Sequence, residues 1–87
     1  MSKIDTESFS NLFVVTVAHT TMHIIDNYVH FFDLHAGDVF VKIRKISHEE
    51  VKKFGLIEHN RYWCYFPKFS IYLLITDYKL ENLCVKL

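Results

Sequence analysis

The stretch from Arg61 to Tyr72, RYWCYFPKFSIY, constrains the fold most, because half of its twelve residues are aromatic. Aromatic side chains are enriched in strands, where they pack on a pleated, half-buried surface. Pro67 cannot donate a ladder hydrogen bond, so it predicts a turn or an edge at that point. From Phe69 to Thr76 both alternate sets of residues are apolar, as in a strand covered on both faces. The sequence therefore predicts a strand, a break and a central strand over residues 61–76.

Two segments nearer the N-terminus form a predicted hairpin. Residues 13–25 are rich in Val, Ile and Thr, whose β-branching favours a strand. A helix remains the alternative, because Phe9, Phe13 and Val17 would lie on one helical stripe. The dipeptide Asp26-Asn27 has turn chemistry, so residues 28–34 are expected to return as the second arm.

Residues 39–46 follow a predicted turn at residues 35–38 and show the clearest alternation in the chain. One set of side chains is apolar and the other is mixed, with Val39, Val41 and Ile43 on one face and Phe40, Lys42 and Arg44 on the other. We expect the first set to point into the core and the second set to point outward.

A short helix is predicted over residues 48–54, ending at Gly55. Ser47 and Glu50 have the spacing of a capping box, in which the two residues satisfy each other's backbone amides. Val51 and Phe54 would dock this helix on the sheet. A turn is expected over residues 79–82, followed by a last strand that directs its apolar side chains inward, namely Leu83, Val85 and Leu87.

These elements predict an α+β fold with a small antiparallel sheet in βββαββ order, forming an open barrel or packed by one short helix. Residues 1–87 are expected to form a single domain. A domain of this size buries only about two thirds of its unfolded surface. Because 51% of the residues are apolar, we expect an exposed apolar patch and a homodimer.

Charge and cysteine content bear on the cellular setting. The net charge is zero, yet residues 1–41 hold one Lys against five carboxylates, and residues 42–68 hold seven Lys or Arg against three. This asymmetry predicts a basic and an acidic face, unless the fold mixes the charges. Cys64 and Cys84 lack the spacing of a disulfide framework, which indicates reduced thiols and a cytoplasmic protein. No signal peptide, membrane span or membrane partner is expected.

The amino-acid usage also bears on origin. Ile, Phe, Tyr, Lys and Asn supply 33 residues, whereas Ala, Gly, Pro and Arg supply seven, as AT-rich codons would produce. This bias is compatible with a phage, a virus, a mobile element or a low-GC bacterium. It favours a small accessory protein.

The candidate binding surface combines basic and aromatic side chains from two predicted strands and the break after them. Its residues are Phe40, Lys42, Arg44, Arg61, Trp63, Tyr65 and Lys68. Trp, Tyr and Arg dominate protein-binding hot spots, and rings beside cations also bind single-stranded nucleic acid. The zero net charge and the lack of an RNP-type pattern favour a protein partner. In the alternative register Trp63 and Tyr65 belong to the core, and Tyr62, Cys64 and Phe66 point outward.

No catalytic or metal motif accompanies this surface. Cys64 lacks a neighbouring base, and the sequence contains no nucleophile elbow or phosphate-binding glycine loop, so we expect a protein that is not an enzyme and holds no cofactor. Four histidines are weak candidates for a metal site, but their spacing matches no ligand motif: His19, His23, His30 and His35. The leading hypothesis is a phage- or virus-encoded modulator that occludes a host protein. The alternatives are a single-stranded nucleic-acid-binding protein and a His-dependent metal-binding protein.

Overall fold

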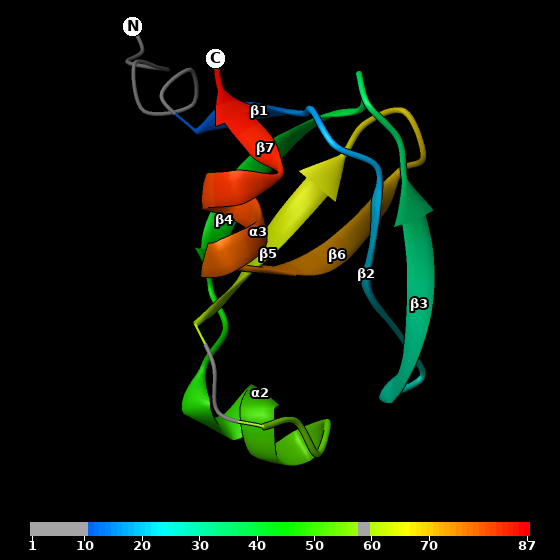
Figure 1. Ribbon diagram of the computed structural model, residues 1–87. Helices are drawn as coiled ribbons and strands as arrows, with labels where there is room; N and C mark the ends of the chain where they lie inside the picture. Colours follow the sequence, from blue (N-terminus) through cyan, green and yellow to red (C-terminus); the bar gives the residue numbers. More distant parts are fainter. Residues whose placement is uncertain (1–10, 58–59) are drawn as a thin grey trace, which may run out of the picture.

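The computed structural model describes residues 11–57 and 60–87. The elements follow one another along the chain as β1 (Leu12–Val15), β2 (His19–Ile25), β3 (Tyr28–Leu34), β4 (Val39–Lys45), α2 (His48–Lys53), β5 (Arg61–Phe66), β6 (Ile71–Thr76), α3 (Asp77–Asn82) and β7 (Cys84–Lys86). The seven strands form one open sheet in the order β3-β2-β6-β5-β4-β1-β7, in which every pair is antiparallel (Figure 1). The predicted α+β class with an antiparallel sheet is confirmed.

The sheet is strongly curled, as its connections require. Strands β1 and β2 lie four positions apart in the sheet, yet only residues 16–18 join them. In a flat sheet four strand spacings would cover about 19 Å, whereas the link reaches at most about 14 Å. The ends of the sheet must therefore bend toward each other, and Figure 1 shows the strands wrapping around a common interior.

The interior holds the first core, which defines the inner face of the sheet. Phe40 stacks between Phe13 and Phe66, with ring centroids 5.4 and 4.7 Å away. Leu73 and Ile75 from β6 are fully buried in the same cluster, and other strands and α3 complete it through Val15, Leu34, Cys64, Leu80 and Cys84. Face-to-face stacking of this kind removes large apolar surfaces from water, which is the dominant favourable term in folding.

A second, smaller core lies on the outer face, where α2 docks. Ile46, Val51 and Leu74 are its buried members, and Trp63 and Phe54 pack against them. The predicted capping box is present, since Ser47 Oγ accepts from the Glu50 amide at 3.1 Å and the Glu50 carboxylate accepts from the Ser47 amide. The predicted helix stop and its docking residues are likewise confirmed, with Gly55 at φ 67°.

Two predicted elements differ from the structure. Residues 13–25 form two strands instead of one, because the amides of Thr16 and Val17 both donate to the Leu83 carbonyl and lead the chain out of β1. The turn expected over residues 79–82 forms the last four residues of the six-residue helix α3. This helix has its own cap, the Thr76 hydroxyl, which accepts from the Lys79 amide at 3.3 Å.

Two predicted sets of core residues are wrong. In β4, Phe40 is fully buried while Val39 and Ile43 are exposed, because one Phe that fits between two rings buries more surface than the smaller side chains would. In β7, Cys84 is buried while Val85 is exposed, and Leu87 beyond the strand is exposed too.

Within the described part of the chain, no helix combines the length and the apolar character that crossing a membrane requires.

Candidate interaction surface

The predicted binding residues of β4 do not share one face. The pairing of β4 with β5 shifts between Lys42 and Arg44, so Ile43 is the extra residue of a β-bulge. Lys42 lies opposite Cys64 on the inner face, whereas Arg44 lies opposite Trp63 on the outer face. The prediction that Phe40, Lys42 and Arg44 point outward together is therefore wrong, because alternation fails at a bulge.

Phe40 and Lys42 have structural roles on the inner side of the sheet. Phe40 is inaccessible to any partner in this fold. The Lys42 ammonium lies 4.4 Å from the centroid of the Tyr62 ring and 6.0 Å from that of Phe13, within the range of cation–π attraction. Lys42 therefore closes the rim of the first core.

In β5 the predicted alternation holds, and the alternative register is wrong. Cys64 and Phe66 are buried in the first core, so Arg61, Trp63 and Tyr65 lie on the opposite side. Arg61 is nevertheless buried, and its Nη1 donates to the Ile57 carbonyl at 2.6 Å. Burial lowers its pKa. Arg61 therefore holds the chain between α2 and β5 and contributes little to the surface.

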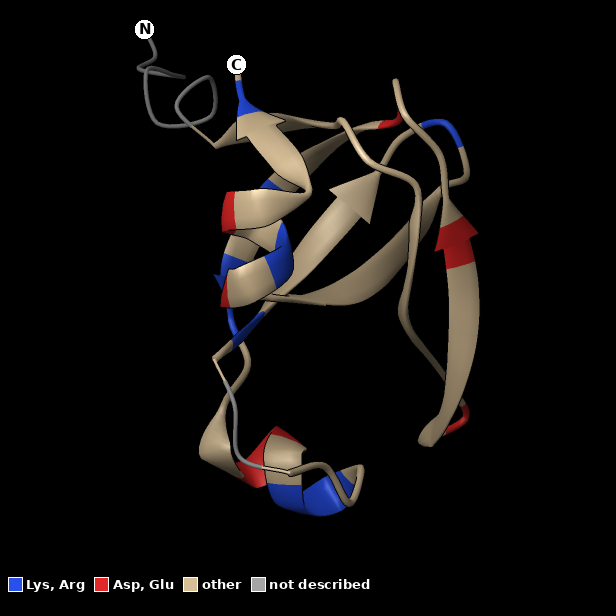
Figure 2. Cartoon of the chain, in the orientation of Figure 1, with Lys and Arg blue, Asp and Glu red and all other residues tan. Residues whose placement is uncertain are grey.

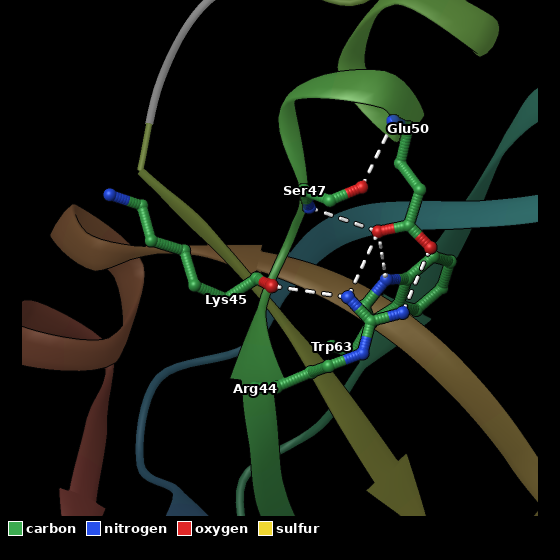
Figure 3. Close-up of polar contacts among 5 residues, drawn as sticks. All are labelled: Arg44, Lys45, Ser47, Glu50 and Trp63. Atoms are coloured by element: carbon green, nitrogen blue, oxygen red, sulfur yellow. Dashed lines mark hydrogen bonds and ion pairs between the residues drawn. The ribbon is translucent and has the colours of Figure 1, made fainter.

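Arg44, Glu50 and Trp63 form a polar cluster that fastens α2 to the sheet (Figure 3). Arg44 Nη1 and Nη2 donate to the two Glu50 oxygens at 3.0 and 2.9 Å, and Trp63 Nε1 donates to Glu50 Oε1 at 3.2 Å. The Glu50 pKa is lowered to about 2, chiefly because Arg44 donates to the carboxylate, with help from the Ser47 amide and Trp63. Arg44 in turn has a raised pKa, because its charged form is bonded to Glu50.

Trp63 also supports α2 through apolar contact. Its ring meets Phe54 edge-on, with centroids 6.3 Å apart and planes at 86°. Phe54 and Trp63 both pack against the second core. The cluster and this contact account for Arg44 and Trp63 structurally, so neither residue requires a partner to explain its place.

Beyond the reach of α2, the outer face carries an uncovered apolar area that we call the open patch. Its residues come from β4, β5 and β6: Val39, Val41, Ile43, Tyr65 and Tyr72. Tyr65 and Tyr72 are cross-strand partners whose ring centroids lie 4.9 Å apart. Tyr72 is 53% exposed and Ile43 is 49% exposed. Exposed apolar side chains grouped in this way mark interaction surfaces more often than scattered ones do.

A hollow adjoins the open patch where β2 diverges from β6. Its volume is about 500 Å³. One wall comes from β4, β5 and β6 and the other from β2, and the lining residues include Ile43, Arg44, Trp63, Tyr72, His23 and Ile24. The two strands pair only at Met22 and Leu74, so their ends separate beyond that point. The exposed Tyr72 ring thus lies beside a depression that could accept a protruding side chain.

Sequence reasoning missed part of this surface. Val39, Val41 and Ile43 were expected in the core, and Tyr72 was expected beneath a covering layer. The one sequence signal was that both alternate sets in β6, and one set plus Phe40 in β4, are apolar, which does not say which face of the sheet is closed. Of the predicted residues, Tyr65 belongs to the open patch, and Arg44 and Trp63 border it.

Lys68 lies apart from the open patch, in the turn between β5 and β6. Its ammonium is 3.9 Å from Asp38 Oδ1 and 5.4 Å from the centroid of the Phe69 ring, which packs against the first core. Lys and Arg occur on α2, α3, β4 and β7 as well, and both helices also carry acidic residues (Figure 2). The described residues therefore show mixed charge instead of one basic face.

The four candidate histidines are spread along β2, β3 and the turn after them. His23 and His30 lie directly opposite each other across the β2–β3 ladder, and His19 Nδ1 is 2.7 Å from the Val17 carbonyl. His35 donates its backbone amide to Asp38 Oδ2. In residues 11–57 and 60–87, no three His, Cys, Asp or Glu side chains gather closely enough to hold a metal ion.

Both cysteines are buried, free thiols. Burial raises the pKa of Cys64 to about 12, with a further contribution from Cys84, and raises that of Cys84 to about 11. A thiol with a raised pKa is a poor nucleophile at neutral pH.

Comparison of the chain with protein-family models, with curated proteins and with solved structures found no match.

Proposed function

We propose that this chain is a small, non-enzymatic binding protein that contacts an apolar area of another protein through the open patch. The observation that carries the proposal is the exposed Tyr72 ring paired with the half-buried Tyr65 ring, beside Ile43 and the adjoining hollow. Interface cores are enriched in aromatic side chains, and a protruding side chain seated in a pocket is the usual form of a hot spot. The mechanism would be occlusion, in which the patch covers a functional surface of the partner.

The remaining parts of the hypothesis concern setting. Two unpaired thiols and the AT-rich amino-acid usage support a cytoplasmic protein encoded by a phage or virus, acting on a protein of its host. The high apolar content supports self-association as a homodimer.

The test is affinity capture from host lysate with the wild type and two matched variants. Tyr72→Glu places a charge in the open patch, and Tyr78→Glu makes the same change at a Tyr on α3 that is 69% exposed. We expect the partner to be retained by the wild type and by Tyr78→Glu, and lost from Tyr72→Glu. Equal retention by both variants would contradict the proposal.

Single-stranded nucleic acid is the second candidate, because Tyr65 and Tyr72 could stack bases while Arg44, which borders them on the same face, contacts a phosphate. Nuclease treatment of the captured material distinguishes the two. Loss of the bound material on treatment, with affinity that falls steeply as salt rises, would favour nucleic acid. A metal-binding function rests on the His23–His30 pair and would require stoichiometric zinc or nickel in untagged protein.

A further inference from the structure

Strand β3 forms one edge of the sheet and lacks most of the features that usually protect an edge. It pairs with β2 over seven consecutive residues without a bulge, and it contains no Lys, Arg or Pro. Its one charged residue, Asp33, accepts a hydrogen bond from the Thr20 hydroxyl within the hairpin. Phe31 is 71% exposed, and Tyr28 is also exposed, whereas the opposite edge, β7, has three residues and ends with Lys86. Long, regular edges without lysines, prolines or bulges are templates for pairing with another strand.

The hairpin turn fixes which backbone groups of β3 face the free edge. Asp26 and Asn27 both have positive φ, at 52° and 67°, as a two-residue type I′ turn requires. In such a hairpin the closing pair, Ile25 and Tyr28, exchanges both hydrogen bonds, and the following pairs alternate. Val29, Phe31 and Asp33 therefore direct their N–H and C=O groups away from β2.

An independent contact agrees with this alternation. Thr20 is the β2 partner of Asp33, so its carbonyl should point away from β3. The Lys79 ammonium, on α3, donates to that carbonyl. The backbone groups of Asp33 are thus free of β2 and available at the edge.

We propose that β3 pairs antiparallel with β3 of a second copy, about a two-fold axis perpendicular to the sheet at Phe31. This inference rests on the self-association proposed above and supplies its surface. Side chains of the two copies continue the same faces only if odd-numbered residues pair with odd-numbered residues and even with even. Phe31 is the middle of the three residues whose N–H and C=O groups point away from β2. The register sets Phe31 opposite Phe31, and Val29 opposite Asp33, forming about six intermolecular backbone hydrogen bonds.

The edge is complementary to itself in this register. The register pairs Phe31 with Phe31 at the centre, Tyr28 with Leu34, and His30 with Phe32. No like charges therefore oppose each other. The chain also has zero net charge, so two copies do not repel. A strand without an aromatic residue at its centre would gain the backbone bonds but not the central ring pair.

The test is sedimentation and light scattering across a range of concentrations. Phe31→Pro removes an outward N–H for which no residue in the described part of the chain is an acceptor, and an edge strand tolerates proline at such a position. Phe31→Lys keeps the backbone and places two like charges at the centre. We expect a concentration-dependent wild-type dimer whose dissociation constant rises on the order of tenfold or more in each variant.

Val85→Lys is the matched control, because it places the same charge on the opposite edge and should leave the dimer intact. Hydrogen exchange adds a direct reading, since the Phe31 amide should become protected as the concentration rises. A monomeric wild type, or a dimer insensitive to Phe31→Lys, would overturn the proposal, as would a dimer lost through Val85→Lys. None of these results bears on partner capture by the open patch, so the two proposals can fail separately.

Discussion

The inner and outer faces of the sheet bury aromatic side chains in different ways. The curl of the sheet closes the inner face, so Phe40 and Phe66 lose all contact with water. The outer face is covered only where α2 docks, so Trp63 is partly buried while Tyr72 is largely exposed. Strand β5 supplies aromatic residues to both faces, so residue type alone does not tell which rings are fully buried.

The largest expected difference concerns thiol reactivity. Cys64 has a pKa of about 12 against an ordinary value of 9.0, so its reactive thiolate is roughly a thousandfold rarer at neutral pH. Tyr72→Cys would add a third thiol to the chain, on the outer face at a position that is 53% exposed. Mass spectrometry after iodoacetamide treatment should find position 72 modified quickly and Cys64 and Cys84 unmodified until urea is added. Rapid native labelling of Cys64 would contradict the closed inner face.

The next largest difference concerns stability. Phe40→Ala should lower the free energy of unfolding by about 3–5 kcal/mol, because it empties a fully buried space between two rings. Tyr72→Ala removes an exposed ring and should change stability by about 0.5 kcal/mol or less. Urea titration of both variants measures the contrast. Similar losses in the two variants would mean that the outer face is packed as tightly as the inner one.

Trp63 lies between these extremes. If Trp63 were only a binding residue, Trp63→Ala would leave the fold intact, but its contacts with Phe54 and Glu50 predict a loss of about 2 kcal/mol in the free energy of unfolding and release of α2. Trp63→Phe keeps a ring and loses only the Nε1 hydrogen bond, so about half that loss is expected. Circular dichroism and urea titration would check the order. Unchanged stability in Trp63→Ala would restore its role as a free binding residue.

The smallest expected difference is a dependence on pH. Folding lowers the pKa of Glu50 from 4.5 to about 2, so its charged form stabilises the native state above about pH 4.5, and this contribution is lost as the pH falls toward 2. Glu50→Gln should therefore be less stable than the wild type at neutral pH, and the gap should close in acid. Thermal unfolding across this range measures the gap. A difference that stays constant with pH would argue against the Arg44–Glu50 pair.

Local chemistry determined much of what could be predicted. The Ser47–Glu50 capping box, the Asp26-Asn27 turn and the end of α2 at Gly55 depend on groups a few residues apart, so the sequence specified them. Thr76 provided a similar signal for α3 that was missed. The interior position of β6, between β2 and β5, was also predicted from its two apolar sets of side chains, although Tyr72 on the outer face is exposed.

The faces of the sheet were decided by tertiary structure. In β4 both alternate sets contain apolar residues, and the choice of Phe40 for the interior depended on the rings of Phe13 and Phe66, which come from distant segments. The bulge at Ile43 depended on pairing with β5 and moved Arg44 away from Lys42. The sequence by itself determined the local elements and the apolar character of two faces. Strand order and packing decided which face closed, because register is fixed by contacts between residues far apart in the chain.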